Sequence, residues 1–196
     1  AKPERFLTPE GRPLRFMDAV ASGLSVGVPG LLAMLEAAHR EHGRMQWQAL
    51  FSSALRIAEE GFVITPRLAT LIATDRALRN SEQARELFFR EDGIPRRAGD
   101  RFYNRDLART LRRIAREGSR AFYEGEIASH IVAAVRAVPR PGDLTEADLA
   151  AYKPVRREAL CTTYRGERIC GMPPPSSGAA TIAMMLGMLE RFPLAR

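Results

Sequence analysis

The 196-residue sequence lacks an apolar run of transmembrane length, and it holds only three histidines, two cysteines and one tryptophan. The missing apolar run excludes a helical membrane span from these residues. His39 and His42 share one helix, but Glu36 and Glu41 beside them do not complete a recognisable metal-ligand set. No zinc-protease, P-loop, serine-hydrolase or dinucleotide-binding motif occurs in a fitting context. The sequence therefore predicts neither a metal centre nor a nucleotide site.

The composition is that of an ordinary folded protein, with 45% hydrophobic and 27% charged residues. A chain of this length can bury a sizeable core in a single domain. No secretory signal is present, and the first residue is Ala rather than Met. We therefore expect a piece of a longer protein, so the missing signal says little about the parent.

A net charge of +7 permits an acidic partner. The basic residues are mostly arginines spread over amphipathic helices, however, and no basic stripe is interleaved with aromatic residues. We expect no nucleic-acid partner. A free-standing basic helical module that binds an acidic partner remains the alternative outside the enzymes.

Helix signals dominate the first three-quarters of the chain and predict a helical layer over residues 1–152. Pro29 and Gly43 bracket a helix over residues 30–42. Asn104 and Gly118 bracket a basic amphipathic helix, and Thr145 with Asp148 resembles a capping box. Helices are expected over residues 30–42, 46–60, 66–78, 81–88, 105–117, 125–138 and 145–152. The strands are expected only after residue 152.

The segment from Cys161 to Cys170 reads as a tight hairpin with Arg165-Gly166 at its tip. A two-residue turn places Cys161 opposite Cys170 at a non-hydrogen-bonded pair, with Cα atoms about 4.5 Å apart. That separation lies at the short end of the disulfide range. The spacing suits neither a zinc knuckle nor a thioredoxin motif. A disulfide in an oxidising compartment and a pair of ordinary reduced strand cysteines both remain open.

A proline elbow, residues 173–175, follows the hairpin and lacks backbone donors. Ser176-Ser177-Gly178 is expected to cap a helix over residues 179–190, which is apolar on nearly every face and is therefore predicted to be buried. Ser176 and Ser177 are the candidate site residues. Two hydroxyls at a helix N-terminus can bind an anion or orient an active-site loop, or they can simply cap the helix.

These C-terminal residues carry a family resemblance. Tyr164-Arg-Gly, followed by Met172-Pro-Pro-Pro-Ser-Ser-Gly178, closely resembles a signature of the γ-glutamyltranspeptidase (glutathione hydrolase) family. One departure is Ala179, where the family usually has a second glycine. Further motifs follow in the family's order at Ser25–Gly30, Glu60–Phe62, Phe122–Ala128 and Leu144–Tyr152.

The resemblance implies an internal segment of the family's large subunit, and so a fragment of an αββα N-terminal-nucleophile hydrolase fold. The chain itself is expected to be mainly α, with a small β portion near its C-terminus. Such an enzyme cleaves itself, and the freed N-terminal Thr attacks the γ-glutamyl amide of glutathione. The γ-glutamyl group then passes to water or to amino acids and peptides. The resemblance implies no cofactor, a small subunit of the same precursor as partner, and a periplasmic or secreted address.

No catalytic residue is then expected in this chain, because the resemblance places the nucleophilic Thr after Arg196. Thr162-Thr163 lies inside the hairpin, where the β preference of threonine accounts for it. We expect residues 1–196 to form a single partial domain, with the helical layer at 1–152 and the hairpin, elbow and helix at 153–196. The chain alone is expected to be inactive. A related cephalosporin or glutaryl acylase is the alternative within enzymes.

Separation from the rest of the parent is expected to leave an apolar face of the last helix uncovered. The fragment is then expected to self-associate, or its last helix is expected to pack differently from that of the parent. The residues of that face are Ile182, Met185, Leu186 and Leu189.

Overall fold

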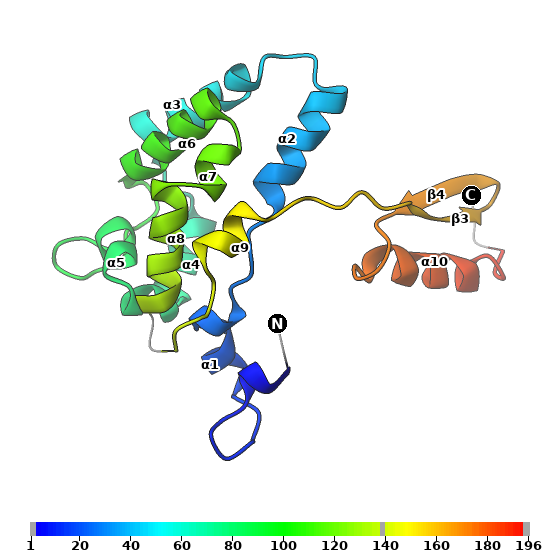
Figure 1. Ribbon diagram of the computed structural model, residues 1–196, viewed down its shortest axis with the longest axis horizontal. Coiled ribbons are helices and arrows are strands. Elements are labelled where there is room, and N and C mark those ends of the chain that lie inside the picture. Colours follow the sequence, from blue (N-terminus) through cyan, green and yellow to red (C-terminus); the bar gives the residue numbers. More distant parts are fainter. Residues whose placement is uncertain (1–2, 138–139, 194–196) are drawn as a thin grey trace. The chain divides into compact units, whose positions relative to one another are not determined.

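The computed structural model describes residues 3–137 and 140–193 (Figure 1). The chain divides into two compact units, an N-terminal unit that ends at Pro154 and a C-terminal unit that begins at Val155. The N-terminal unit is almost wholly helical, and the C-terminal unit holds a hairpin and one helix. The expectation of a mainly α chain with a small β portion near its C-terminus is confirmed. That residues 1–196 form a single partial domain stays a prediction.

The N-terminal unit contains a succession of short helices and one small sheet. Its elements are η1 Pro3–Phe6, α1 Phe16–Val20, η2 Gly23–Ser25, α2 Leu31–His42, η3 Trp47–Phe51, α3 Ser52–Glu60, β1 Phe62–Val63, α4 Pro66–Thr74, η4 Ala77–Asn80, α5 Glu82–Phe88, β2 Arg101–Phe102, α6 Arg105–Glu117, α7 Arg120–Tyr123, α8 Glu126–Ala137 and α9 Glu146–Ala150. The C-terminal unit contains β3 Leu160–Tyr164, β4 Glu167–Gly171 and α10 Gly178–Leu189.

Side-chain caps fix most of the helix starts that the sequence predicts. Thr65, Ser81 and Asn104 accept hydrogen bonds from backbone N–H groups in the first turns of α4, α5 and α6. At α9, the Thr145 hydroxyl accepts from Asp148 N at 3.1 Å, and the Asp148 carboxylate accepts from Thr145 N at 2.9 Å. The predicted capping box is confirmed.

Three helix boundaries differ from the predictions. The helix expected over residues 46–60 begins as the 3-10 turn η3, whose Trp47 indole N–H donates to Ile114 O on α6 at 3.2 Å. The helix expected to reach residue 78 ends at Thr74, because the Asp75 carboxylate accepts from Ala77 N at 2.8 Å and starts η4. α9 ends at Ala150 rather than 152. The predicted end of α8 at residue 138 lies outside the described residues.

A two-stranded sheet that the sequence did not indicate joins β1 to β2. Gly61 ends α3 with a φ of +77°, after which Phe62 pairs with Phe102 in antiparallel register. The Phe102 ring lies 5.4 Å from Phe88 and belongs to a buried cluster with Ile64 and Ile72. Strands of two residues are too short to show an alternating pattern, so this pairing was invisible in the sequence.

The larger core cluster lies where α7, α8 and α9 pack together (Figure 1). Its buried members are apolar apart from one tyrosine: Tyr123, Ala128, Val132, Val135, Leu144 and Leu149. Partly buried side chains from the segment before α2 and from its first turn, including Val26, Val28 and Leu32, pack against this cluster. Burial of this apolar set stabilises the N-terminal unit.

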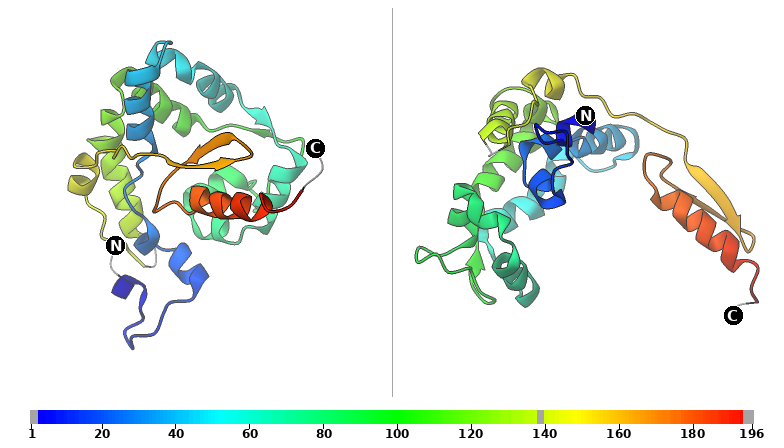
Figure 2. Two further views of the ribbon diagram at one scale, coloured as in Figure 1. Left: turned by 90° about the vertical axis from the view of Figure 1, so that its right-hand side faces the viewer. Right: turned by 90° about the horizontal axis from the view of Figure 1, so that it is seen from below.

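In the C-terminal unit, β3 and β4 pair with Cys161 opposite Cys170 and Tyr164 opposite Glu167, which confirms the predicted register. Arg165 and Gly166 both have positive φ, at +51° and +85°, as a tight hairpin turn requires. α10 packs along this hairpin (Figure 2).

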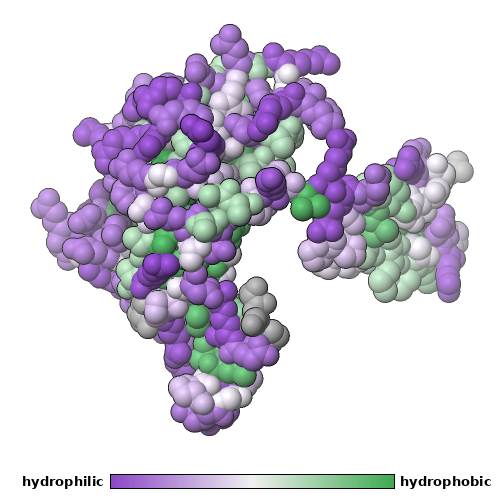
Figure 3. Space-filling model, viewed as in Figure 1, coloured by the Kyte–Doolittle hydropathy of each residue, from purple (hydrophilic) through white to green (hydrophobic). Residues whose placement is uncertain are grey.

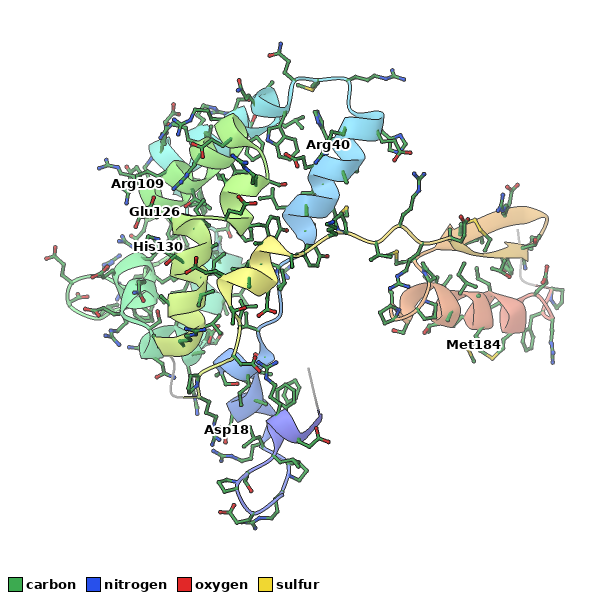
Figure 4. The ribbon with its side chains drawn as sticks, viewed as in Figure 1. Asp18, Arg40, Arg109, Glu126, His130 and Met184 are labelled. Carbon is green, nitrogen blue, oxygen red and sulfur yellow. A yellow bond between two sulfur atoms is a disulfide. The ribbon has the colours of Figure 1, made fainter. Side chains whose placement is uncertain are left out.

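The prediction that α10 is buried is wrong for the chain as described. Figure 3 shows apolar residues on the surface of the C-terminal unit, and no residue of α10 is buried. Met184 is 70% exposed and extends from the side of α10 that faces away from the hairpin (Figure 4). Ile182, Met185 and Leu189 are exposed, as the expectation of an uncovered face requires, whereas Leu186 is partly buried. Among the described residues of this unit, the hairpin is the only other regular structure, and it covers only one face of α10.

Candidate functional site

The candidate serines stand at the start of α10, immediately after the proline elbow. Ser177 holds the N-cap position, but its φ of −84° and ψ of −15° are helical, and its side chain makes no cap hydrogen bond. Its carbonyl instead accepts from Thr181 N and Thr181 Oγ1, each at 2.9 Å. Both serines are exposed, and within residues 3–137 and 140–193 neither hydroxyl has a hydrogen-bond partner. The side-chain cap expected here is therefore not formed.

The elbow turns the chain so that these hydroxyls lie beside free backbone donors. Ser176 N donates to Pro173 O at 3.2 Å, and the Pro174-Pro175 peptide bond is cis. The first N–H groups of a helix have no partner within it. Two free hydroxyls next to these N–H groups form a donor-rich edge, which suits a carboxylate or a developing oxyanion.

Close packing between β4 and α10 holds the two ends of the elbow together. A methyl group added at Gly171 would lie 2.8 Å from the Cβ atom of Ala179, which is below contact distance. Gly171 ends β4 and Ala179 is the second residue of α10. At this contact Gly171 is the residue without a side chain, and the methyl group of Ala179 fills the space beside it.

The cysteines lie near the open end of the hairpin, away from its tip, with Cys161 on β3 and Cys170 on β4. The structure joins Cys161 and Cys170 in a disulfide whose Cα atoms are 4.1 Å apart. Arg168 Nη2 donates to Cys161 Sγ at 3.5 Å. Because cross-strand partners share a face, Cys161, Thr163, Arg168 and Cys170 all lie on one side of the hairpin.

In the N-terminal unit, three segments that carry the family resemblance meet around Tyr123. Its hydroxyl donates to Pro29 O at 2.6 Å and accepts from Ala33 N at 3.1 Å. Burial raises the pKa of this phenol, which keeps it a donor. The ring stacks on Tyr152 at a centroid distance of 5.9 Å, and Gly30 leaves the space that the Tyr152 ring occupies. These motif residues join the start of α2 to α7 and to the segment after α9.

A second polar contact ties α2 to α7. Glu36 accepts from Ser119 N at 2.9 Å, from Ser119 Oγ at 2.7 Å and from Arg40 at 2.8 Å. Burial alone would raise the pKa of this carboxyl, but the hydrogen bonds from Ser119 and Arg40 outweigh it and lower the pKa. Sequence reasoning missed this pair because the two residues are 83 positions apart. The only local signal was a polar residue directly after the helix-ending Gly118.

Most arginines of the basic helix α6 have acidic partners, which leaves no continuous basic stripe there. Arg113 contacts Glu117 at 3.3 Å and Glu126 at 2.7 Å, while Arg112 pairs with Glu59.

His39 bonds through Nε2 to Met45 O at 2.8 Å and packs edge-on against the Trp47 ring. Over the described ranges, no group of three or more His, Cys, Asp or Glu side chains could hold a metal ion. None of the described helices is both long enough and apolar enough to cross a membrane.

Comparison with known proteins identifies the fold that contains these features. The family model of Gamma-glutamyltranspeptidase matches residues 1–196. The chain belongs to the γ-glutamyltranspeptidase family. It is 35% identical over 191 residues to the glutathione hydrolase proenzyme of Escherichia coli (strain K12), a match that covers 96% of this chain and 32% of that protein. The resemblance seen in the motifs is thereby confirmed.

Solved structures agree with this family assignment. The γ-glutamyltranspeptidase of Helicobacter pylori aligns with a TM-score of 0.92 and 30% identity, over 100% of this chain and 55% of that one. A cephalosporin acylase from Bacillus halodurans aligns less well, with a TM-score of 0.73 and 27% identity over 100% of this chain and 38% of that one. The chain spans about a third of the length of the curated relatives it matches.

Proposed function

We propose that this chain is part of the large subunit of a γ-glutamyltranspeptidase precursor. The mature enzyme cleaves the γ-glutamyl amide of glutathione and passes the γ-glutamyl group to water or to the amine of an amino acid or peptide. One observation carries this proposal: the family model matches the whole of residues 1–196, elbow and serines included. The high TM-score with a solved γ-glutamyltranspeptidase supports it.

The nucleophile in this proposal is a Thr located after Arg196, which self-cleavage of the precursor turns into the N-terminus of the small subunit. Its hydroxyl attacks the γ-glutamyl carbonyl while its own α-amine takes the hydroxyl proton. The amine of the substrate leaves, and water or an acceptor amine then releases the γ-glutamyl group from the enzyme. No metal or organic cofactor enters this scheme.

Ser176 and Ser177 supply hydrogen-bond donors near that reaction. Their hydroxyls are exposed and unpartnered among the described residues, and they adjoin the free N–H groups of the first turn of α10. Such an edge can orient a substrate carboxylate or stabilise negative charge on the attacked carbonyl oxygen.

The proposal also sets the chain's partner and address. The exposed outer face of α10 is where the remainder of the precursor, including the small subunit, packs. Without that cover the chain is inactive and self-associates. The enzyme acts in the periplasm or outside the cell, an address that suits the Cys161–Cys170 disulfide.

A comparison of two amide substrates tests the reaction class. The full-length protein is assayed with a γ-glutamyl anilide and with the matching glutaryl anilide, which lacks the α-amine. We expect turnover of the γ-glutamyl compound with at least a tenfold preference over the glutaryl compound, because a site that pairs the amine discriminates strongly against its absence. Preference for the glutaryl compound would assign the protein to the acylases, which the weaker alignment to the cephalosporin acylase keeps as the second candidate.

A further inference from the structure

One face of α10 lies along the hairpin of β3 and β4 (Figure 2). Partly buried residues follow helical spacing on that face: Ala179, Ala183 and Leu186. The next position in this series is Glu190, directly after the last residue of α10. The spacing therefore brings one acidic residue to the hairpin side of the helix, at the end away from Ser176 and Ser177.

Glu190 contacts the tip of the hairpin. The backbone N–H of Arg165 donates to Glu190 Oε1 at 3.1 Å. Arg165 has a φ of +51°, which is uncommon for a residue with a side chain, and this hydrogen bond helps to hold that conformation. A carboxylate after the last turn of a helix meets the negative end of the helix dipole. Because the charged hydrogen bond to the tip offsets that repulsion, it accounts for an acidic side chain at this position.

The Gly171–Ala179 contact holds the other end of α10 against the same hairpin. Eleven helical rises of about 1.5 Å place Glu190 about 16 Å from Ala179. Across the turn, Arg165 lies five strand levels from Gly171, and five rises of about 3.4 Å give about 17 Å. The two lengths agree, so both contacts form together and limit how far α10 slides along the hairpin. Both lie inside the C-terminal unit, and neither depends on what covers that unit.

We propose that Glu190 is a positioning residue for the candidate site at Ser176 and Ser177. The role rests on the proposed function, in which these serines orient a substrate carboxylate or stabilise the attacked carbonyl oxygen. α10 is the rigid element between Glu190 and the serines, and a slip of one residue along its axis moves its N-terminus by about 1.5 Å. A misplacement of about 1 Å can lower a reaction rate by about 100-fold. Glu190 thus acts on the reaction through the helix and does not touch the substrate.

Substitutions at Glu190 in the full-length protein test this role with the γ-glutamyl anilide. Glu190→Ala removes the acceptor, and we expect kcat/KM to fall by about fivefold or more. Glu190→Gln keeps an oxygen acceptor for the Arg165 N–H and should restore most of the activity, whereas Glu190→Asp is one methylene shorter and should not. Glu167→Ala removes the same charge from the other side of the same turn, so it is the matched control and should leave kcat/KM unchanged. Equal kcat/KM in the wild type and in every Glu190 variant would overturn the proposal.

A double-mutant cycle separates positioning from a general loss of stability. If Glu190 acts through the serines, Glu190→Ala should lower kcat/KM little further in a protein that already carries Ser176→Ala and Ser177→Ala. The same loss of kcat/KM in both backgrounds would show that Glu190 does not act through the serines, and would overturn the assignment.

Hydrogen exchange on the same proteins separates this proposal from the proposed function, because it does not require activity. We expect peptides that cover residues 172–181 to exchange faster in Glu190→Ala than in the wild type, and Glu167→Ala to show no such change, because only the first variant releases the far end of α10. Faster exchange in a protein that does not cleave the anilide would support the link between Glu190 and the serines and contradict the enzymatic activity. Cleavage of the anilide with unchanged exchange and unchanged kcat/KM in Glu190→Ala would do the reverse.

Discussion

At the scale of single residues, Gly27 and Gly30 of the Ser25–Gly30 motif differ sharply in the space around them. A methyl group at Gly30 would lie 2.6 Å from Cζ of Tyr152, whose ring is held by stacking on Tyr123. Gly30 has a φ of −91°, which suits any residue, so the obstacle to a side chain is steric. We expect Gly30→Ala to lower the free energy of unfolding by about 1–3 kcal/mol, as other overpacked cores do.

Urea unfolding of the two alanine variants measures this effect. Gly27, three positions earlier, has no atom within 4 Å of an added methyl group, so Gly27→Ala is the matched control and should change stability little. Equal stability of Gly30→Ala and Gly27→Ala would show that Tyr152 does not fill the space above Gly30.

The Glu36–Ser119 contact makes part of the stability depend on pH. Because the folded protein lowers the pKa of Glu36 below its ordinary value of 4.5, the charged carboxylate stabilises the fold. That contribution is complete above pH 4.5 and is lost as the pH falls through the lowered pKa. Glu36→Gln should therefore cost about 1.5–3 kcal/mol at neutral pH, the range for a hydrogen bond to a charged group.

Unfolding by urea at neutral pH and at successively lower pH tests this prediction. The difference between wild type and Glu36→Gln is expected to shrink as Glu36 becomes protonated. Glu91→Gln, at an exposed position in the α5–β2 connection, is the control and should show no such convergence. A Glu36→Gln deficit that stays constant down to the lowest pH would contradict the role of the charge.

At the scale of elements, the contact of β4 with α10 sets the shape of the elbow. Gly171→Ala places a methyl group 2.8 Å from the Ala179 Cβ, so we expect a loss of about 1–3 kcal/mol and a shift of the Ser176-Ser177 loop. Ala179→Gly creates the missing space, and the double variant Gly171→Ala/Ala179→Gly should recover part of the loss. Thermal unfolding of the wild type and the three variants gives the coupling between the positions.

Gly187 provides the control for α10. A methyl group there meets no atom within 4 Å, so Gly187→Ala should stabilise the helix by up to about 1 kcal/mol through propensity alone. If Ala179→Gly does not relieve Gly171→Ala, the two residues do not face each other.

Elements fixed by neighbouring residues were the ones that the sequence could predict. The capping box at Thr145, the helix bracketed by Asn104 and Gly118, and the hairpin register around Arg165-Gly166 all depend on residues within a few positions. The pairing of β1 with β2 and the bond from Ser119 to Glu36 join residues dozens of positions apart. The periodicity of hydrophobic residues does not indicate contacts between residues so far apart, and so the sequence did not predict them.

The candidate site was predictable in place but not in detail. The motif located Ser176 and Ser177 at the start of α10, yet the helical backbone of Ser177 turns its hydroxyl away from capping. The Gly171–Ala179 contact beside this residue is likewise not revealed by the sequence pattern. The exposure of α10 depends on what covers it, and apolar composition alone does not say what that is.

At the scale of the whole molecule, the outer face of α10 governs the behaviour of the isolated 196-residue chain. Thr181 is the only polar side chain in this helix, and Met184 and Met188 are 70% and 58% exposed. We expect light scattering to find dimers or larger species at micromolar concentrations, because an apolar surface of this kind favours association.

Lysine substitutions identify the surface responsible. Met184→Lys and Met188→Lys should each shift the chain toward monomer, since a charge in an apolar contact is costly. Met17→Lys, at a position that is 63% exposed in the N-terminal unit, should leave association unchanged. A monodisperse wild-type monomer would contradict the prediction.

The central claim is that these residues belong to the large subunit of a self-processing γ-glutamyltranspeptidase. The most direct measurement is the intact mass and N-terminal sequence of every polypeptide in the purified protein expressed from its full gene. We predict two polypeptides: a larger one that contains this chain and a smaller one that begins with Thr. A single unprocessed polypeptide, or a smaller one that begins with another residue, would contradict the account.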